Sequence, residues 1–175
     1  MHHRHPPIPR LWLMTDERMG GALWAALERL PRGSGVVFRH YATPHAERTA
    51  LWRRVVRIAA KRGLVLVRAG RDLGRGGQGV HNERPGSRQL LHTTSAHGRR
   101  DAIRAIRDGA DAVFVSPVFA TRSHPGARPM GRVRFGLAIR GLSVPVIALG
   151  GMDAKRARRL RGFGIHGWAA IDALS

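Results

Sequence analysis

The 175-residue sequence predicts an α/β fold of the (β/α)8, or TIM-barrel, class. Apolar runs typical of buried parallel strands alternate with helical patterns in a regular order, and eight such runs can be placed along the chain. Several runs end in glycine, histidine or hydroxyl residues, which suit a polar ligand at the C-terminal mouth of a barrel better than they suit packing. We expect one domain over residues 10–175, preceded by a flexible tail over residues 1–9.

The first half of the chain is expected to supply four strands, at residues 10–15, 36–39, 64–67 and 79–81. Helices are expected at residues 20–30 and 47–62, the second with Leu51, Val55 and Ile58 on one face. No third helix is expected over residues 70–79, because each interior glycine destabilises a helix by about 1 kcal/mol relative to alanine. Residues 82–89 also lack a clear helical pattern.

The second half follows the pattern more regularly. Strands are expected at residues 90–94, 112–115, 144–149 and 167–171, and helices at 98–109, 153–161 and, after a loop over 119–131, in a short segment ending at residue 140. The sequence reaches Ser175 directly after the eighth strand. The prediction is therefore a compact barrel with its third and fourth helices reduced and its eighth helix absent.

Composition excludes several classes of protein. An apolar content of 43% allows a substantial core, and the absence of cysteine excludes disulfides and thiolate metal sites. No run approaches the roughly 18 apolar residues of a membrane span, and the N-terminus does not resemble a secretory signal. We therefore predict a cytoplasmic protein without a membrane partner.

The formal net charge of +20 allows a different function, because clustered lysine and arginine side chains neutralise nucleic-acid phosphates. The arginines are spread over nearly every expected helix, however. The two densest groups, at residues 53–62 and 155–161, carry no interleaved aromatic residues for base stacking. A nucleic-acid partner is therefore the less favoured interpretation.

Glycines at the end of the seventh expected strand are candidates for a phosphate site. Gly150 and Gly151 lead directly into the helix that begins at Asp153, so their amides and the helix dipole could hold a phosphate. The alternative is a tight turn that needs glycine for conformational reasons alone. Asp172, after the eighth strand, would repel a phosphate if its carboxylate pointed inward.

Four histidines, His40, His81, His97 and His124, follow strand ends and are expected to face one mouth. An imidazole titrates near neutral pH, so His97, two residues beyond Ser95, is a candidate to take and return a proton. A zinc site built from these histidines is an alternative, although their spacing matches no known ligand pattern.

Polar residues on other loops complete the expected site. Thr121, Arg122 and His124 belong to a loop expected over the mouth, with Arg122 as a candidate anion contact. Arg39, at the end of the second strand, is a further candidate for binding substrate or phosphate.

An ordered set of motifs at successive strand ends resembles the thiamine phosphate synthase and TenI family of barrel proteins. The set comprises LMTD at 13–16, GVH at 79–81, SAH at 95–97, GADAVFVSPVFAT at 109–121, SHPGARPMG at 123–131, IALGG at 147–151 and GWAAI at 167–171. The resemblance, which runs from Leu11 to Leu174, implies a phosphorylated thiazole or thiamine phosphate as ligand. It also implies that His97, in the Ser-x-His motif with Ser95, transfers a proton during TenI-like thiazole tautomerisation.

The chain departs from the synthase pattern at the residues that would hold magnesium. Synthases of this family clamp a pyrimidine pyrophosphate with magnesium bound by acids after the third and fourth strands. Here Arg68 and Ala69 replace the first pair, Tyr41 stands where a lysine is expected, and Glu83 is the candidate for one metal ligand. No cofactor is therefore assigned, and magnesium would be needed only if condensation activity is retained.

Two other functions stay open at this point. One is a catalytically silent barrel that binds a ligand or a partner protein, and the other is the basic nucleic-acid-associated protein. The four tryptophans, at positions 12, 24, 52 and 168, exceed what a barrel interior needs, so we also leave open a homo-oligomer with some of them at its interface.

Overall fold

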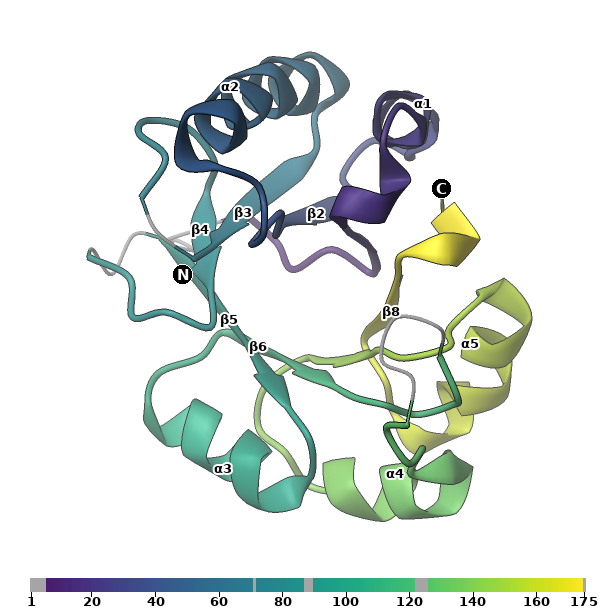
Figure 1. The fold of residues 1–175 in the computed structure, drawn as a ribbon. Coiled ribbons are helices and arrows are strands. Elements are labelled where there is room, and N and C mark those ends of the chain that lie inside the picture. The colour runs from purple at the N-terminus through teal and green to yellow at the C-terminus, as the bar shows by residue number, and fades with distance from the viewer. Residues whose placement is uncertain (1–5, 71, 87–89, 122–125, 175) are drawn as a thin grey trace.

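The computed structural model describes residues 6–70, 72–86, 90–121 and 126–174. Eight parallel strands form a closed barrel in chain order, with β1 also pairing with β8 (Figure 1). The strands are β1 Leu11–Met14, β2 Gly35–Phe38, β3 Val65–Ala69, β4 Gly79–His81, β5 Leu91–Ala96, β6 Ala112–Val115, β7 Val146–Ala148 and β8 Gly167–Ala170. The predicted fold class is confirmed.

Helices cover the barrel unevenly. They are α1 Ala22–Arg29, α2 His45–Arg62, α3 Arg99–Arg107, α4 Gly131–Ile139 and α5 Ala154–Leu160, with short 3-10 turns η1 Glu17–Met19, η2 Arg161–Phe163 and η3 Asp172–Leu174. The described residues between β3 and β4, and between β4 and β5, form no helix (Figure 1). After β8 the described chain makes only the turn η3. The expected reduction of the third, fourth and eighth helices is thus confirmed for the described residues.

Some boundaries differ from those expected. Strand β5 continues to Ala96, because Ser95 and Ala96 pair with Phe114 and Val115 of β6, so Ser95 lies within the strand rather than after it. Strand β7 is shorter than expected and begins only after Pro145, which has no N–H to give to a ladder. Helix α2 begins two residues early, directly after Pro44.

The barrel interior is filled by large side chains that strand glycines accommodate. Trp12 of β1 is fully buried, and a Cβ added at its β2 partner Gly35 would overlap the indole ring. The indole lies edge-on to Phe114 of β6, with a centroid separation of 5.2 Å. The ring of His81 lies at the same distance from Phe114. These contacts fill the interior of the barrel with aromatic side chains.

The N-terminal segment is tied to the opposite end of the barrel. The carbonyl oxygen of Ile8 accepts a hydrogen bond from His166 at 2.8 Å, and that of Pro9 accepts one from the Trp12 indole at 2.7 Å. Of the expected flexible tail, residues 1–5 lie outside the described part of the chain. Within the described segments, none of the helices has the length and apolar character to span a bilayer.

Candidate active site

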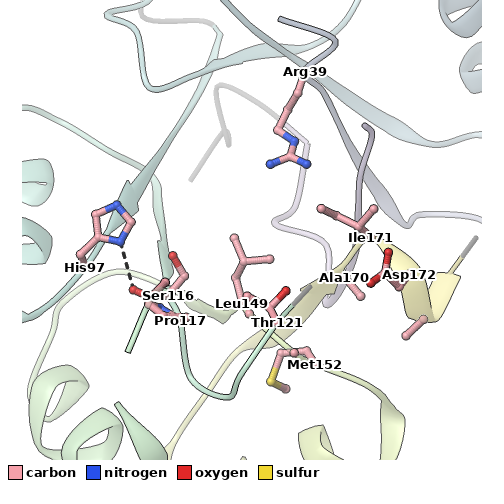
Figure 2. A pocket seen from close by; sticks show the side chains of 14 residues that line it. Arg39, His97, Ser116, Pro117, Thr121, Leu149, Met152, Ala170, Ile171 and Asp172 are labelled. Carbon is pink, nitrogen blue, oxygen red and sulfur yellow. Dashed lines mark hydrogen bonds between the residues drawn. The ribbon is translucent and has the colours of Figure 1, made fainter. Parts of the chain in front are cut away.

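A pocket of about 160 Å³ opens at the C-terminal mouth of the barrel. Residues after five different strands line it, and Figure 2 shows Arg39, His97, Ser116 and Thr121 around it together with Leu149, Met152 and Asp172. One buried water needs only about 10–15 Å³ by the same kind of measure, so the pocket has room for a small organic ligand. Its position is the one at which barrel proteins of this class carry their chemistry.

The structure brings together five of the residues expected from the sequence. Arg39, His97, Thr121, Gly150 and Gly151 all line the pocket. Arg122 and His124 lie outside the described residues, so their expected contribution stays a prediction.

Backbone geometry accounts for both glycines after β7. Gly150 has φ +93°, and a Cβ there would lie 2.7 Å from the Cα of Pro117; Gly151 has φ +59°, and a Cβ there would overlap the carbonyl oxygen of Ala120. Both conformations and both contacts require glycine without any ligand. The turn explanation therefore accounts for the residue type, and any phosphate site must be argued from the amides.

The backbone amides of these two glycines are available to bind a ligand. In the described part of the chain, the N–H groups of Gly150 and Gly151 donate to no protein acceptor. The N-terminus of α5, in contrast, is already occupied, because the carboxylate of its N-cap Asp153 accepts a hydrogen bond from Arg156 N at 2.7 Å. Of the two contributions suggested by the sequence, the glycine amides and the helix dipole, an anion would therefore meet the amides directly.

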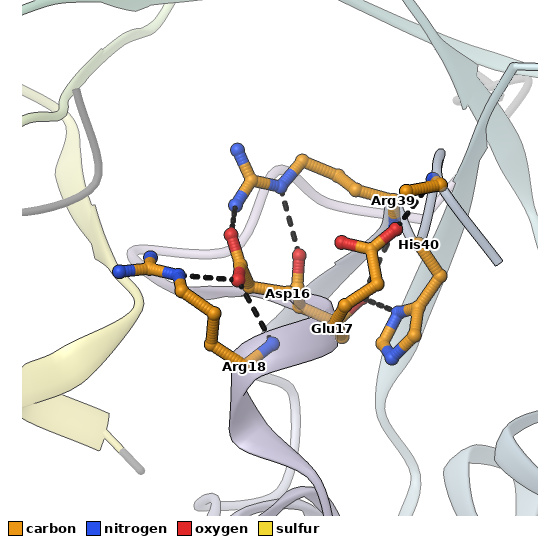
Figure 3. A network of polar contacts seen from close by, with 7 residues as sticks. Asp16, Glu17, Arg18, Arg39 and His40 are labelled. Carbon is orange, nitrogen blue, oxygen red and sulfur yellow. Dashed lines mark hydrogen bonds and ion pairs between the residues drawn. The ribbon is translucent and has the colours of Figure 1, made fainter.

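Arg39 enters the pocket from the end of β2, where residues after β1 hold it (Figure 3). Its Nε donates to the carbonyl oxygen of Thr15 at 2.8 Å, and its Nη2 lies 3.0 Å from Asp16 Oδ2. The backbone N–H of Arg39 donates to Thr15 Oγ1 at 3.0 Å. Burial lowers the pKa of Arg39, but a guanidinium stays charged at neutral pH.

Asp16 is the centre of this network. Its Oδ1 accepts hydrogen bonds from the backbone and the Nε of Arg18, at 3.1 and 2.7 Å. Burial alone would raise the pKa of Asp16, but the bonds and charge of Arg18, with the charge of Arg39, lower it below its ordinary value. The hydrogen bond to Asp16 and the charge of Asp16, with a smaller contribution from the charge of Asp172, in turn raise the pKa of Arg18. Asp16 is therefore a carboxylate at neutral pH.

His97 stands at the pocket wall with its tautomer set by a backbone group. Its Nδ1 lies 3.2 Å from the carbonyl oxygen of Ser116, which can only accept, so Nδ1 carries the proton (Figure 2). In the neutral ring the basic lone pair then resides on Nε2. Asp101 Oδ2 accepts from the His97 backbone N–H at 3.1 Å and fixes the start of this loop. His97 is thus arranged as a proton acceptor.

His81 is placed differently from His97. It is 1% exposed inside the barrel, its Nδ1 lies 2.9 Å from Thr93 Oγ1, and its Nε2 lies 3.0 Å from Ser95 Oγ. Burial lowers its pKa to about 3, so the ring is neutral. Because Thr93 Oγ1 donates to the carbonyl oxygen of Val80 at 3.3 Å, it accepts from His81 Nδ1, and His81 Nε2 accepts from the Ser95 hydroxyl. Neither His81 nor Ser95 lines the pocket; His81 orients Ser95 from beneath it.

The remaining expected residues have local partners. His40 is buried, with Nδ1 2.9 Å from Thr15 Oγ1, and its pKa is lowered by burial. Glu83 Oε2 lies 3.8 Å from Arg68 Nη2, and the same guanidinium contacts Asp72 at 2.9 Å. Asp172 lines the pocket. Its carboxylate is the group expected from the sequence to repel a phosphate if it pointed inward.

Asp16, Glu17, Asp72 and Glu83 are engaged by cations or amides rather than grouped around a common point. Asp16 is held by two arginines, Glu83 and Asp72 share Arg68, and Glu17 Oε1 accepts from the Ala42 N–H at 2.7 Å. Among the described residues, no three His, Asp or Glu side chains gather as a metal site would require. These residues do not fit the magnesium clamp of a synthase.

Sequence reasoning missed several contributors to the site. Ser116 directly follows the apolar run of a strand. That position could have identified it, as it identified the residues at the ends of other strands. Leu149 supplies an apolar wall, which looked like ordinary strand core. Asp16 was recognised only as part of a motif, because its pairing with Arg39 depends on the register of two strands.

Comparisons with known proteins identify the family. The family described as thiamine monophosphate synthase (TMP-TENI) matches residues 11–174. The thiamine-phosphate synthase of Salinispora tropica is 34% identical over 189 residues, covering 96% of this chain and 90% of that protein. The match to the thiamine-phosphate synthase of Chloroflexus aurantiacus, 36% identical over 81 residues, covers 46% of this chain and only 38% of that protein.

A solved structure shares the fold. The thiamine phosphate pyrophosphorylase from Pyrococcus furiosus superposes with a TM-score of 0.78 at 22% identity, covering 97% of this chain and 88% of that one. At this identity the likeness supports the barrel alone, whereas the family match extends over nearly the whole sequence. This chain therefore belongs to the thiamine phosphate synthase and TenI family of thiamine-biosynthesis barrels.

Proposed function

We propose that the protein binds a phosphorylated thiazole, or thiamine phosphate, in the pocket at the barrel mouth and that His97 transfers a proton on the bound thiazole. One observation carries the proposal. A guanidinium, two backbone N–H groups that have no acceptor among the described residues, and an imidazole with a basic Nε2 line one small pocket. A phosphate ester of a small heteroaromatic ring matches this set, because its phosphate accepts from the guanidinium and the N–H groups and its ring offers a proton to the imidazole.

The phosphate end would be held by Gly150 and Gly151 together with Arg39. Loop amides and a guanidinium both donate to phosphate oxygens, and charge-assisted bonds of this kind are the strong ones. Asp172, which also lines the pocket, would repel a second anion bound beside this phosphate. The site thus suits a single phosphate better than it suits a large polyanion.

The apolar part of the pocket would hold the ring. Leu149, Met152 and Ile171 supply apolar side chains to its lining. His97 Nε2 would remove a proton from a ring or ring-adjacent C–H, whose electron pair enters the conjugated system, and would return the proton at a second position. Atoms and electrons balance because the step is an isomerisation, and it needs no metal.

Metal-dependent condensation with a pyrimidine pyrophosphate is not part of the proposal. That reaction, as the family resemblance describes it, relies on carboxylates that bind magnesium. Here arginines or a backbone amide engage Asp16, Glu17 and Glu83, and Ala69 stands where one acid is expected.

Calorimetric titration with hydroxyethylthiazole phosphate tests the ligand, and NMR of a thiazole phosphate tautomer tests the proton transfer. We expect micromolar binding to the unmodified chain that persists at 0.5 M salt. His97→Asn should retain binding within about threefold and lose isomerisation by at least 100-fold, as expected for removal of a general base. Gly150→Ala should weaken binding at least tenfold by displacing the loop amides.

His45→Asn provides the matched control, because His45 is an exposed histidine at the first turn of α2, away from the pocket. It should leave both binding and isomerisation unchanged. Absence of binding to the unmodified chain at any salt would refute the ligand. Undiminished isomerisation by His97→Asn would refute the role of His97.

A further inference from the structure

The orientation of Arg39 depends on the loop that follows β1. The Thr15 carbonyl accepts from the Nε of Arg39, and the Asp16 carboxylate, which Figure 3 shows beside the guanidinium, accepts from its Nη2. With the Nε–H and one Nη2–H engaged on the β1 side, the second Nη2–H and the two Nη1–H groups remain for a ligand. The Arg39 side chain is 15% exposed, so little water competes for it.

Asp16 is held in place by contacts other than its contact with Arg39. It caps η1 through the Arg18 N–H and bonds the Arg18 side chain, and its own side chain is 18% exposed. A carboxylate already held by two hydrogen bonds from Arg18 offers a defined position to a third donor. The position of Arg39 therefore depends on the loop after β1. Arg39 is the only arginine, among the described residues, that lines the pocket.

The same network separates Asp16 from metal binding. Its Oδ1 accepts from Arg18 and its Oδ2 pairs with Arg39, so a divalent cation would have to displace two guanidinium contacts to reach it. A fixed guanidinium supplies positive charge at the mouth without a metal.

We propose that Asp16 is a positioning residue, which holds Arg39 so that its free edge faces a ligand phosphate, and that the site binds this phosphate without a divalent cation. The inference rests on the proposed function for the identity of the ligand. The contacts between Asp16 and Arg39 do not depend on it, which allows the two to be tested separately.

The first experiment is a double-mutant cycle on hydroxyethylthiazole phosphate binding, with Asp16→Asn, Arg39→Met and the double variant, each with EDTA and with magnesium. Asparagine is as good a helix N-cap as aspartate, so the start of η1 should be kept. Glu28→Gln is the matched control, because Glu28 pairs with Arg62 at 3.7 Å on the outer surface.

We expect Asp16→Asn to weaken binding five- to tenfold at 0.3 M salt, where the loss of orientation outweighs the removal of a screened negative charge. In the Arg39→Met background the same change should alter affinity by less than twofold. Magnesium should leave every affinity within twofold, and Glu28→Gln should match the unmodified protein. An equal effect of Asp16→Asn in both backgrounds, or a tenfold gain with magnesium, would overturn the proposal.

A second readout needs no ligand. The Arg39 Nε–H, identified in ¹⁵N NMR spectra by its loss in Arg39→Lys, should exchange slowly with solvent and at least tenfold faster in Asp16→Asn. Unchanged exchange in Asp16→Asn would show that Asp16 does not hold the guanidinium. If the unmodified protein bound no thiazole phosphate, the proposed ligand would fail, and this exchange rate would still decide the positioning role.

Discussion

Protonation of His81 should destabilise the fold at mildly acidic pH. Its pKa is lowered from an ordinary 6.5 to about 3 by burial, and the ring bonds Thr93 and Ser95 inside the barrel. A lowered histidine pKa means that the unfolded chain takes up the proton first. The stabilisation is therefore complete above pH 6.5 and is lost as the pH falls from 6.5 towards 3.

The size of the effect follows from this interval. Each pH unit between the two pKa values is worth about 1.4 kcal/mol, so the loss between pH 7 and pH 4.5 is about 2.5 kcal/mol. Domains are typically stable by about 5–15 kcal/mol, so this change is readily measured. His40 acts in the same direction, because burial also lowers its pKa.

Urea unfolding followed by tryptophan fluorescence at pH 7.0, 5.5 and 4.5 measures the effect. The variant His81→Gln keeps a polar side chain of similar reach and removes the titrating ring. Its free energy of unfolding should fall less than that of the unmodified protein by about 2.5 kcal/mol over this range, and the contribution of His40 should cancel. Parallel pH dependences, within about 0.5 kcal/mol, would refute the argument.

Three other predictions test packing and charge. Gly35→Ala should lower the free energy of unfolding by about 3 kcal/mol, because the added methyl overlaps the ring of Trp12; a loss under 1 kcal/mol in urea would contradict this packing. Arg48→Met should cost about 2–4 kcal/mol in the same assay, because the buried guanidinium donates to the carbonyl oxygens of Arg39 and Ala69 at the ends of β2 and β3. Duplex DNA retained at low salt should be released by 0.3 M NaCl, because the net charge of +20 is spread over the chain; retention at that salt would favour a nucleic-acid role.

Strand positions were predictable because parallel strands are buried on both faces and appear as continuous apolar runs. The runs at 112–115 and 167–171 match β6 and β8 closely. The run at 144–149 overestimated β7, because the apolar residues beside Pro145 look like strand but cannot all join the ladder.

The site was harder to predict, because side-chain partners depend on register. His81 and His97 look alike in sequence, each at a strand end. Only the pairing of His81 with Thr93 shows that one imidazole lies within the barrel, whereas the other stands at the pocket wall. A three-residue strand such as β4 is too short for its alternation to reveal which side chain faces inward.

The pairing of β1 with β8 bears on how the chain is made. Trp12 pairs with Ala169, so the strand that carries the central indole gains its second neighbour only after β8 has been synthesised. Until then, a nascent chain on the ribosome would present one open edge of β1 and an incompletely covered tryptophan, and such surfaces recruit chaperones. We therefore expect folding yield in a cell-free translation system to depend on emergence of β8 from the ribosome tunnel.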